Sequence, residues 1–339
     1  MRAVPFTPYV RSVPSSAPST PGSATDVGPG YREQLYWLRY QDFFPGALRI
    51  TEENAPAEHW WSWRDVRVHV DRVTREHAPA KLIALHGIGT YGRMLAPFGR
   101  LPSLADLEFI APDLPGFGLT RASRRGTTYQ DWIDCVRDLV ALERARDDRP
   151  IVLLGMSTGG RLAYDVAARA GGDVAGVIAT CLIDPQRSEA RRRLAARPEM
   201  ARWSGLLGLV PGPLSTARVP THWLANIAAV SNHAQLANLV WADPIGGGSW
   251  LALGFVRSCL GAAPAVRPEA FTGPPVLLAH PADDRWTPPL LSERFFDRIG
   301  GPTRSAALTG AGHLPVEESG LADLDRAIRD FFEEFGLPW

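Results

Sequence analysis

The stretch "LLGMSTGGRLAYDVAA", residues 153–168, decides the fold predicted for this chain. An apolar run ends at Gly155, a single serine follows at Ser157, and a helical pattern begins after Gly159 and Gly160. The pattern predicts a strand, a cramped turn and a helix, because glycine tolerates close backbone approach in a strained turn. Such a turn presents Ser157 beside the amino end of a helix, as a nucleophile requires. In an ordinary glycine-rich turn, Ser157 would be a surface hydroxyl without a role.

Short, continuously apolar runs recur on both sides of this stretch, and helical patterns separate them. Strands covered by helices on both faces have this composition. The segment "DVRVHVDRV" instead alternates Val66, Val68 and Val70 with polar residues, as a half-exposed strand does. The sequence therefore predicts an α/β fold with a mostly parallel central sheet flanked by helices, with buried strands in residues 81–87, 107–116, 150–156, 174–182 and 274–281.

Composition divides the chain into four parts. Residues 1–30 are rich in Pro, Ser and Gly and lack the apolar stretch of a secretory signal, which predicts a flexible N-terminal tail. Residues 31–183 and 272–339 are predicted to form the first and second parts of the α/β core. The alternation lapses over residues 184–271, an insertion that we expect to form a helical cap over the strand ends. Its tryptophans are candidates for lining a substrate pocket: Trp203, Trp223, Trp241 and Trp250.

Charge and composition narrow the classes of partner. The 339 residues are 45% hydrophobic, and 36 basic residues balance 36 acidic ones. No electrostatic footprint for nucleic acid or an anionic membrane results, so a small molecule is the expected partner. No window approaches the roughly 18 apolar residues of a membrane span, so we expect no integral membrane association. The oligomeric state does not follow from the sequence.

The cysteines and histidines predict neither a metal site nor a cofactor. Cys135, Cys181 and Cys259 form no CxxC pair, and we interpret them as buried thiols of a protein in the reducing cytoplasm. The histidines outside the site proposed below lack H-x-x-x-H spacing. The glycines of "PDLPGFGLT" match nucleotide-binding motifs poorly and are interpreted as a tight turn.

A serine of normal pKa is a poor nucleophile and needs a base that an acid orients. Downstream, "AHPADDRWTP" places Asp283 and Asp284 just past a predicted strand, and "LTGAGHLPVEE" places His313 in a later glycine-rich loop. The chain order is therefore Ser157, acid, His313. Either aspartate satisfies that order.

With "LHGIGTYGR", "DLPGFGLT", "GMSTGG", "DDRWTP" and "GAGHLP" in this order, the chain resembles the α/β-hydrolases from about Val66 to its C-terminus. It is similar in particular to the capped esterase, monoacylglycerol-lipase and lysophospholipase-like branch. The resemblance implies that Ser157 is the nucleophile and His313 the general base and acid. It implies Asp284 as the orienting carboxylate, because Asp284 stands four residues before Pro288 in D-x-x-x-P, and leaves Asp283 as the alternative.

The same resemblance implies an oxyanion hole. Negative charge on the carbonyl oxygen requires backbone N–H groups about 3 Å away, and we assign these to Thr158 and Ile88. His86 in "HGIG" is interpreted as a structural part of that loop. The arginine-rich residues 187–202 are interpreted as the solvated face of a cap helix, with contact to an anionic head group as the alternative.

These assignments predict a serine hydrolase that cleaves a carboxylic ester of a hydrophobic acyl substrate through an acyl-enzyme on Ser157. Thioesters, lactones and amides use the same residues and remain alternatives, as does a non-catalytic ligand-binding protein of this fold. A serine at residue 157 argues against the dehalogenase and epoxide hydrolase branches, which need aspartate there.

Overall fold

The computed structural model describes residues 29–124, 126–196, 199 and 212–339. Its centre is an eight-stranded sheet in the order β1-β2-β4-β3-β5-β6-β9-β10. The pairs β1–β2 and β2–β4 are antiparallel and all later pairs are parallel, so the predicted α/β fold with a mostly parallel sheet is confirmed. The strands are β1 (Ala57–Trp63), β2 (Val66–Val73), β3 (Lys81–Leu85), β4 (Glu108–Pro112), β5 (Ile151–Gly155), β6 (Gly176–Ala179), β9 (Val276–Pro281) and β10 (Thr303–Leu308).

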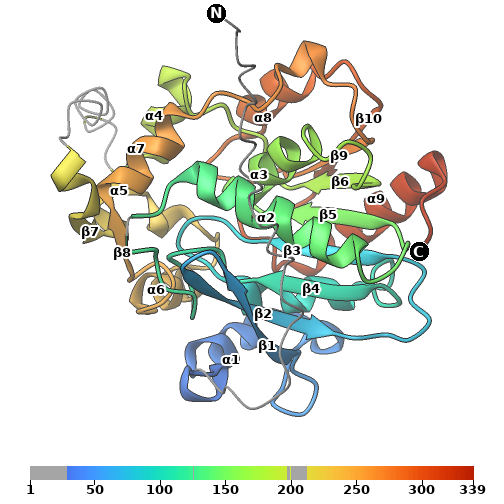
Figure 1. Ribbon diagram of the computed structural model, residues 1–339, viewed down its shortest axis with the longest axis horizontal. Helices are drawn as coiled ribbons and strands as arrows, with labels where there is room; N and C mark the ends of the chain where they lie inside the picture. The colour runs from blue at the N-terminus through green and yellow to red at the C-terminus, as the bar shows by residue number, and fades with distance from the viewer. Residues whose placement is uncertain (1–28, 125, 197–198, 200–211) are drawn as a thin grey trace, which may run out of the picture.

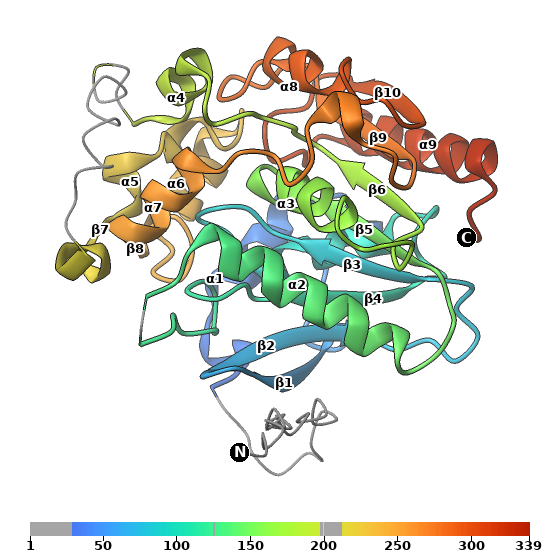
Figure 2. The same ribbon diagram turned by 45° about the horizontal axis from the view of Figure 1, so that its top comes forward.

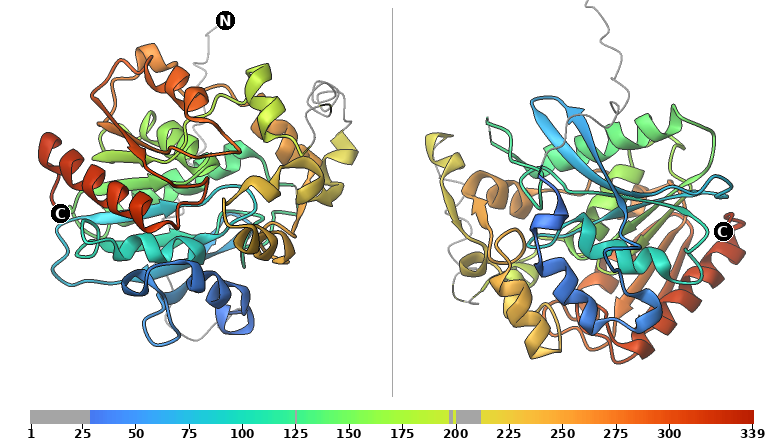
Figure 3. Two further views of the ribbon diagram at one scale, coloured as in Figure 1. Left: turned by 180° about the vertical axis from the view of Figure 1, so that it is seen from behind. Right: turned by 90° about the horizontal axis from the view of Figure 1, so that it is seen from below.

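Helices cover both faces of the sheet, which explains why the central strands are apolar throughout. The helices α2 (Tyr129–Arg144), α3 (Thr158–Ala167) and α8 (Pro289–Phe296) pack on one face. The opposite face carries the 3₁₀ helix η4 (Gly92–Arg100) and the long helix α9 (Glu318–Phe335), seen in the left view of Figure 3. Helix α2 begins with a capping box, in which Thr128 and Asp131 satisfy each other's backbone N–H groups.

The residues ahead of the sheet fold against it rather than forming a separate unit. They contain η1 (Tyr31–Glu33), α1 (Tyr36–Tyr40), η2 (Gln41–Phe43) and η3 (Gly46–Leu48). The buried Tyr31 hydroxyl donates to the Asp113 carboxylate at 2.7 Å, just beyond the end of β4. Asp113 also accepts from the backbone N–H groups of Gly92 and Leu119. One buried carboxylate thus joins three segments of the chain.

A buried histidine on β2 lies among the same acidic groups. The His69 Nδ1 atom lies 3.3 Å from the Asp113 carboxylate, and its Nε2 atom lies 3.0 Å from the Glu58 carboxylate. Burial would lower the pKa of His69, but hydrogen bonding and charge from Asp113, Glu58 and Asp71 outweigh burial and raise the pKa to about 10. His69 is therefore a buried cation at neutral pH.

The chain between β6 and β9 forms a group of short elements at one end of the sheet, seen in Figure 2. Its strands β7 and β8 form a separate antiparallel pair, which the prediction of a helical insertion did not include. The predicted tail of residues 1–30 lies almost wholly outside the described residues, and no helix among those described is long and apolar enough to cross a membrane. The elements are α4 (Ser188–Leu194), η6 (Gly212–Thr216), β7 (Arg218–Pro220), α5 (Thr221–Leu224), η7 (Ile227–Ala229), α6 (Ala234–Ala242), β8 (Trp250–Ala252), α7 (Leu253–Gly261) and η8 (Pro268–Ala270).

Candidate active site

Ser157 occupies a strained turn between β5 and α3. Its φ of 55° and ψ of −125° lie outside the regions that L-residues usually adopt. The neighbouring glycines are required by close approach: a Cβ on Gly159 would lie 2.1 Å from the carbonyl oxygen of Leu85, and one on Gly155 would lie 2.1 Å from that of Gly159. The glycines thus let the turn fold tightly, and Ser157 stands at its tip with a half-buried side chain.

His313 joins Ser157 to Asp284 through its two ring nitrogens. Its Nε2 atom lies 2.8 Å from the Ser157 hydroxyl oxygen, and its Nδ1 atom lies 2.7 Å from Oδ2 of Asp284. Because a carboxylate only accepts, this network assigns the proton to Nδ1 and leaves the Nε2 lone pair facing the serine hydroxyl. The three residues follow β5, β9 and β10 respectively. The serine proton can therefore pass to a base that an acid orients.

Four hydrogen bonds hold the buried Asp284 carboxylate. Its Oδ1 accepts from the backbone N–H groups of Trp286 and Thr287, and its Oδ2 accepts from the Thr287 hydroxyl and His313. Burial alone would raise the pKa of Asp284, but the charge and hydrogen bond of His313 and the hydrogen bonds from Thr287 lower it. Asp284 is thus ionised at neutral pH. The side chain of Asp283, the alternative acid, is exposed at the surface, while its backbone bonds to other loops.

Two backbone amides near Ser157 are open to a ligand. Ile88 and Thr158 both line the cavity that contains the serine hydroxyl, and neither backbone N–H donates to any other residue that the structure describes. Thr158 begins α3, where an N–H has no acceptor within the helix. The loop before Ile88 touches the nucleophile, since a Cβ on Gly87 would lie 2.9 Å from the Cβ of Ser157. A negatively charged oxygen beside Ser157 would meet these donors and the positive end of the α3 dipole.

His86 is held inside the loop rather than facing the cavity. Its Nε2 atom accepts from the backbone N–H of Leu114 at 2.9 Å, so Nδ1 carries the proton and donates to the carbonyl of Gly87 at 2.8 Å. Burial lowers the pKa of His86 and keeps it neutral. Both nitrogens are used, so His86 fixes the loop and has no lone pair for a substrate.

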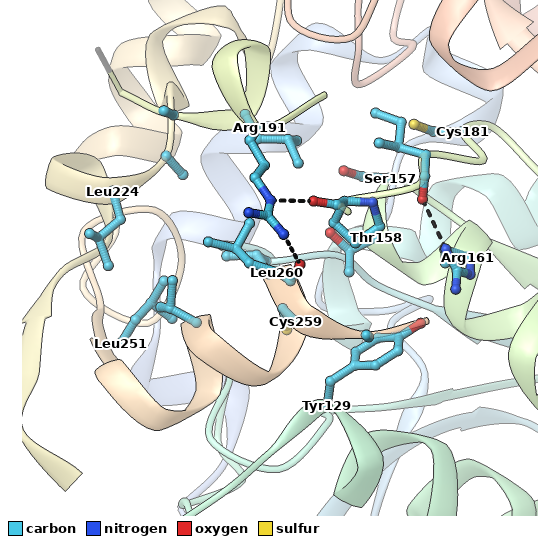
Figure 4. A pocket seen from close by; sticks show the side chains of 18 of the residues that line it. Tyr129, Ser157, Thr158, Arg161, Cys181, Arg191, Leu224, Leu251, Cys259 and Leu260 are labelled. Carbon is cyan, nitrogen blue, oxygen red and sulfur yellow. Dashed lines mark hydrogen bonds between the residues drawn. The ribbon is translucent and has the colours of Figure 1, made fainter. Parts of the chain in front are cut away.

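A cavity of about 420 Å³ opens onto Ser157, within the range of about 300–1,000 Å³ typical of small-molecule sites. The segment between β6 and β9 supplies most of its wall, with Leu224, Leu251, Cys259 and Leu260 visible in Figure 4. Apart from Arg191, this wall is apolar, as an acyl chain requires. Cys181 also lines the cavity, and burial raises the pKa of its thiol to about 12.

The structure does not place the predicted tryptophans in this cavity. Trp223, Trp241 and Trp250 are 60%, 49% and 57% exposed and are absent from its lining, and Trp203 lies outside the described residues. These side chains belong to short surface elements, in which the sequence pattern does not determine which face is buried.

Trp286 is the tryptophan that reaches the site, and it was not predicted. Its ring lies 4.8 Å from the ring of His313, and it lines the cavity. Its place two residues after Asp284, in "DDRWTP", was the available signal. The packing fixes the plane of the imidazole between serine and acid. Among the described residues, no group of His, Cys, Asp or Glu side chains has the arrangement of a metal site.

Comparison with known proteins agrees with the fold. A profile described as "Alpha/beta hydrolase family" matches residues 82–327. The lipase LipV of Mycobacterium tuberculosis is 33% identical over 123 residues, which make up 35% of this chain and only 42% of that relative.

Among solved structures, the monoacylglycerol lipase of Paleococcus ferrophilus superposes with a TM-score of 0.60 at 19% identity, covering 79% of this chain and 99% of that one. A soluble variant of monoglyceride lipase from Saccharomyces cerevisiae, in complex with a substrate analog, gives a TM-score of 0.65 at 15% identity, covering 86% and 98%. At these identities the likeness concerns the fold.

Proposed function

Because the chain belongs to the alpha/beta hydrolase family, we propose that it is a serine hydrolase that cleaves carboxylic esters of hydrophobic acyl substrates. The hydrogen-bonded chain from Ser157 through His313 to Asp284, at 2.8 and 2.7 Å, is the observation that carries the proposal. The apolar cavity at Ser157 supports an acyl substrate, and the lipase relative supports an ester as its bond.

In the first half of the proposed reaction, the Ser157 oxygen attacks the ester carbonyl while its proton moves to Nε2 of His313. The carbonyl oxygen becomes negative and is stabilised by the N–H groups of Ile88 and Thr158. When the tetrahedral intermediate collapses, the bond to the alkoxide oxygen breaks, and His313 returns its proton to the leaving alcohol. The acyl group then remains on Ser157.

In the second half, a water takes the place of the alcohol. His313 accepts one of its protons as the water oxygen attacks the acyl carbonyl, and the oxyanion again meets the two amides. Collapse breaks the bond to Ser157, which recovers its proton from His313 and releases the carboxylic acid. Asp284 stays ionised and stabilises the imidazolium in both halves.

We also propose that residues 184–271 act as a cap, joined to core segments 31–183 and 272–339. Side chains from this insertion line most of the cavity beside Ser157, which supports a role in selecting the substrate. Such a cover would exclude water from the acyl chain and set the chain length that fits.

The test is the initial rate of hydrolysis of p-nitrophenyl esters with acyl chains of two to sixteen carbons, for the wild type and Ser157→Ala. We expect turnover by the wild type and almost none by Ser157→Ala, with unchanged circular dichroism. Retention of wild-type turnover by Ser157→Ala would refute the mechanism. A fluorophosphonate that labels Ser157 in a protein without turnover on esters, thioesters, lactones or amides would instead indicate a ligand-binding protein.

A further inference from the structure

Two arginines, Arg161 and Arg191, line the cavity, and they differ in whether a carboxylate balances the charge of the guanidinium. Arg161, on α3, forms an ion pair with Asp165 at 3.1 Å, and its Nη1 atom donates to the carbonyl of Ile183 at 3.3 Å. Its guanidinium lies 5.1 Å from the centre of the Phe295 ring. The charge of Arg161 is thus compensated by a buried carboxylate, and we assign this residue to the support of α3.

Arg191, on α4, has no such compensation. Its Nε atom donates to the carbonyl of Pro185 at 2.8 Å, and its Nη2 atom donates to the carbonyl of Leu260 at 3.1 Å, as Figure 4 shows. Both acceptors are uncharged. Among residues 29–124, 126–196, 199 and 212–339, no carboxylate lies within 4.0 Å of this guanidinium, and Nη1 donates to no acceptor.

The position of Arg191 differs from that of its neighbours. Arg192 and Arg193, next to it on α4, are exposed, as the sequence-based interpretation of a solvated helix face predicted. Arg191 instead lies on the wall of the cavity that holds Ser157, with Leu224 and Leu251 as other parts of that wall. The structure therefore separates one arginine of this run from the solvated face and turns it toward the substrate.

A cation on an apolar wall gains from a ligand of opposite charge, because the wall itself offers no counter-charge. The two backbone carbonyls fix the direction of the Arg191 guanidinium but leave its full positive charge. A ligand carboxylate at Nη1 would neutralise that charge through a charge-assisted hydrogen bond, and the fixed side chain would lose little entropy on binding. A phosphate monoester carries a charge of about −1.5 to −2 at neutral pH, more than the single guanidinium of Arg191 balances.

We propose that Arg191 is a specificity-determining residue that binds a carboxylate on the ester substrate, so that the preferred substrate is an aliphatic ester with a carboxylate at the far end of one chain. Half-esters of aliphatic dicarboxylic acids belong to this class. The inference rests on the proposed function and deepens it, since the apolar wall holds the chain and Arg191 holds its end.

Two matched substrate pairs test the inference. The first pair is p-nitrophenyl octanoate and the mono-p-nitrophenyl ester of octanedioic acid, with the carboxylate on the acyl side. The second is hexyl butanoate and the butanoate ester of 6-hydroxyhexanoic acid, with the carboxylate on the alcohol side. We expect the wild type to prefer the anionic member of one pair at least tenfold in kcat/KM. Arg191→Gln should lower kcat/KM for that ester about 10- to 100-fold, mainly through KM, as expected for a lost hydrogen bond to a charged group.

Arg192→Gln is the matched control, because it removes an exposed charge from the same helix. It should leave both members of each pair within twofold of the wild type, whereas Arg191→Gln should lower kcat/KM for the anionic member at least tenfold more than for the neutral member of the same pair. Arg191→Lys should recover part of the preference. The inference is overturned if the wild type prefers the neutral member of both pairs, or if Arg191→Gln lowers both members alike, which would indicate a structural role of α4.

Competitive inhibition distinguishes a carboxylate-binding site from a phosphate-binding site. Octanedioate should compete with the anionic ester more strongly than octyl phosphate does, and the reverse order would overturn the carboxylate assignment. Calorimetric titration of Ser157→Ala with monohexyl octanedioate measures binding at the anion site without turnover. Failure of the proposed function appears as no hydrolysis of any ester, whereas failure of this inference appears as hydrolysis without a preference that depends on Arg191.

Discussion

Substituting Asp284 by asparagine isolates the role of its charge, because the shape of the side chain is kept. In the native site Oδ1 accepts two backbone N–H groups, and an asparagine carbonyl can keep both. The amide nitrogen would then replace Oδ2, which faces the Thr287 hydroxyl and Nδ1 of His313 at 2.7 Å each. The hydroxyl can rotate and become an acceptor. The imidazole, whose Nδ1 then faces the new amide, can adapt by moving its proton from Nδ1 to Nε2, because the Thr287 hydroxyl, the other group near Nδ1, lies farther away at 3.1 Å.

That change of tautomer would place an N–H where the Ser157 hydroxyl now meets a lone pair, at 2.8 Å. The serine proton would then have no acceptor, and the imidazolium would have no counter-charge. We expect Asp284→Asn to lower kcat by about 10³- to 10⁴-fold, as in other triads that lose this carboxylate. This loss corresponds to about 4–5.5 kcal/mol of transition-state stabilisation. Because the two backbone bonds persist, the melting temperature should fall by only a few degrees.

The assay is the initial rate on p-nitrophenyl octanoate at neutral pH, with differential scanning calorimetry of each variant. Asp283→Asn is the matched control, because its side chain is exposed next to the same strand, and it should stay within twofold of the wild type. A larger loss in Asp283→Asn than in Asp284→Asn would assign the acid to Asp283. A loss of less than tenfold in Asp284→Asn would refute the tautomer argument.

Two further predictions concern stability. The raised pKa of His69, about 10, means that its contribution is fully present below its unfolded pKa of about 6.5 and is lost as the pH rises through about 10. Urea unfolding should therefore show a free energy of unfolding that falls over this window by about 5 kcal/mol, and a His69→Gln variant that kept the same slope would contradict the assignment. Gly159→Ala should lose more than about 3 kcal/mol, because its Cβ would lie 2.1 Å from a backbone oxygen, whereas Gly46→Ala, with nothing within 4 Å, should unfold like the wild type.

Much of the core was predictable because continuously apolar segments leave few alternatives. The five buried strands predicted from such runs all exist, and so does a strand at Val66. That strand is not half-exposed as predicted, because its polar residues His69 and Asp71 are buried as well. The strand β1 was missed because its tryptophans, Trp60, Trp61 and Trp63, leave no clear alternation of polar and apolar residues. The edge strand β10 was also missed. Its sequence, TRSAAL, mixes polar and small residues because the strand is only partly buried, so it lacks the continuous apolar run of the other parallel strands.

The catalytic residues of the site were predictable, because their motifs follow one another in a characteristic order along the chain. Ser157, Asp284 and His313 were named from motifs in sequence, and the structure brings their side chains within hydrogen-bonding distance. The cavity wall was not predictable, because the short elements of the insertion do not reveal which side faces inward. Arg191 illustrates this limit, since its backbone partners and its place on the cavity wall distinguish it from the exposed arginines beside it, and the sequence reveals neither.

The burial of Tyr31 against Asp113 affects which fragment of this protein should be expressed. The family match spans residues 82–327, and an expression fragment cut at those limits would remove β1, β2 and the last turns of α9. It would leave Asp113 without the Tyr31 hydroxyl and His69, and the edge of β4 without its partner strand. An unpaired edge and an orphaned buried carboxylate both favour aggregation during expression. Fragments meant for crystallisation or directed evolution should therefore begin before Tyr31 and keep α9 intact, and affinity tags belong ahead of that point.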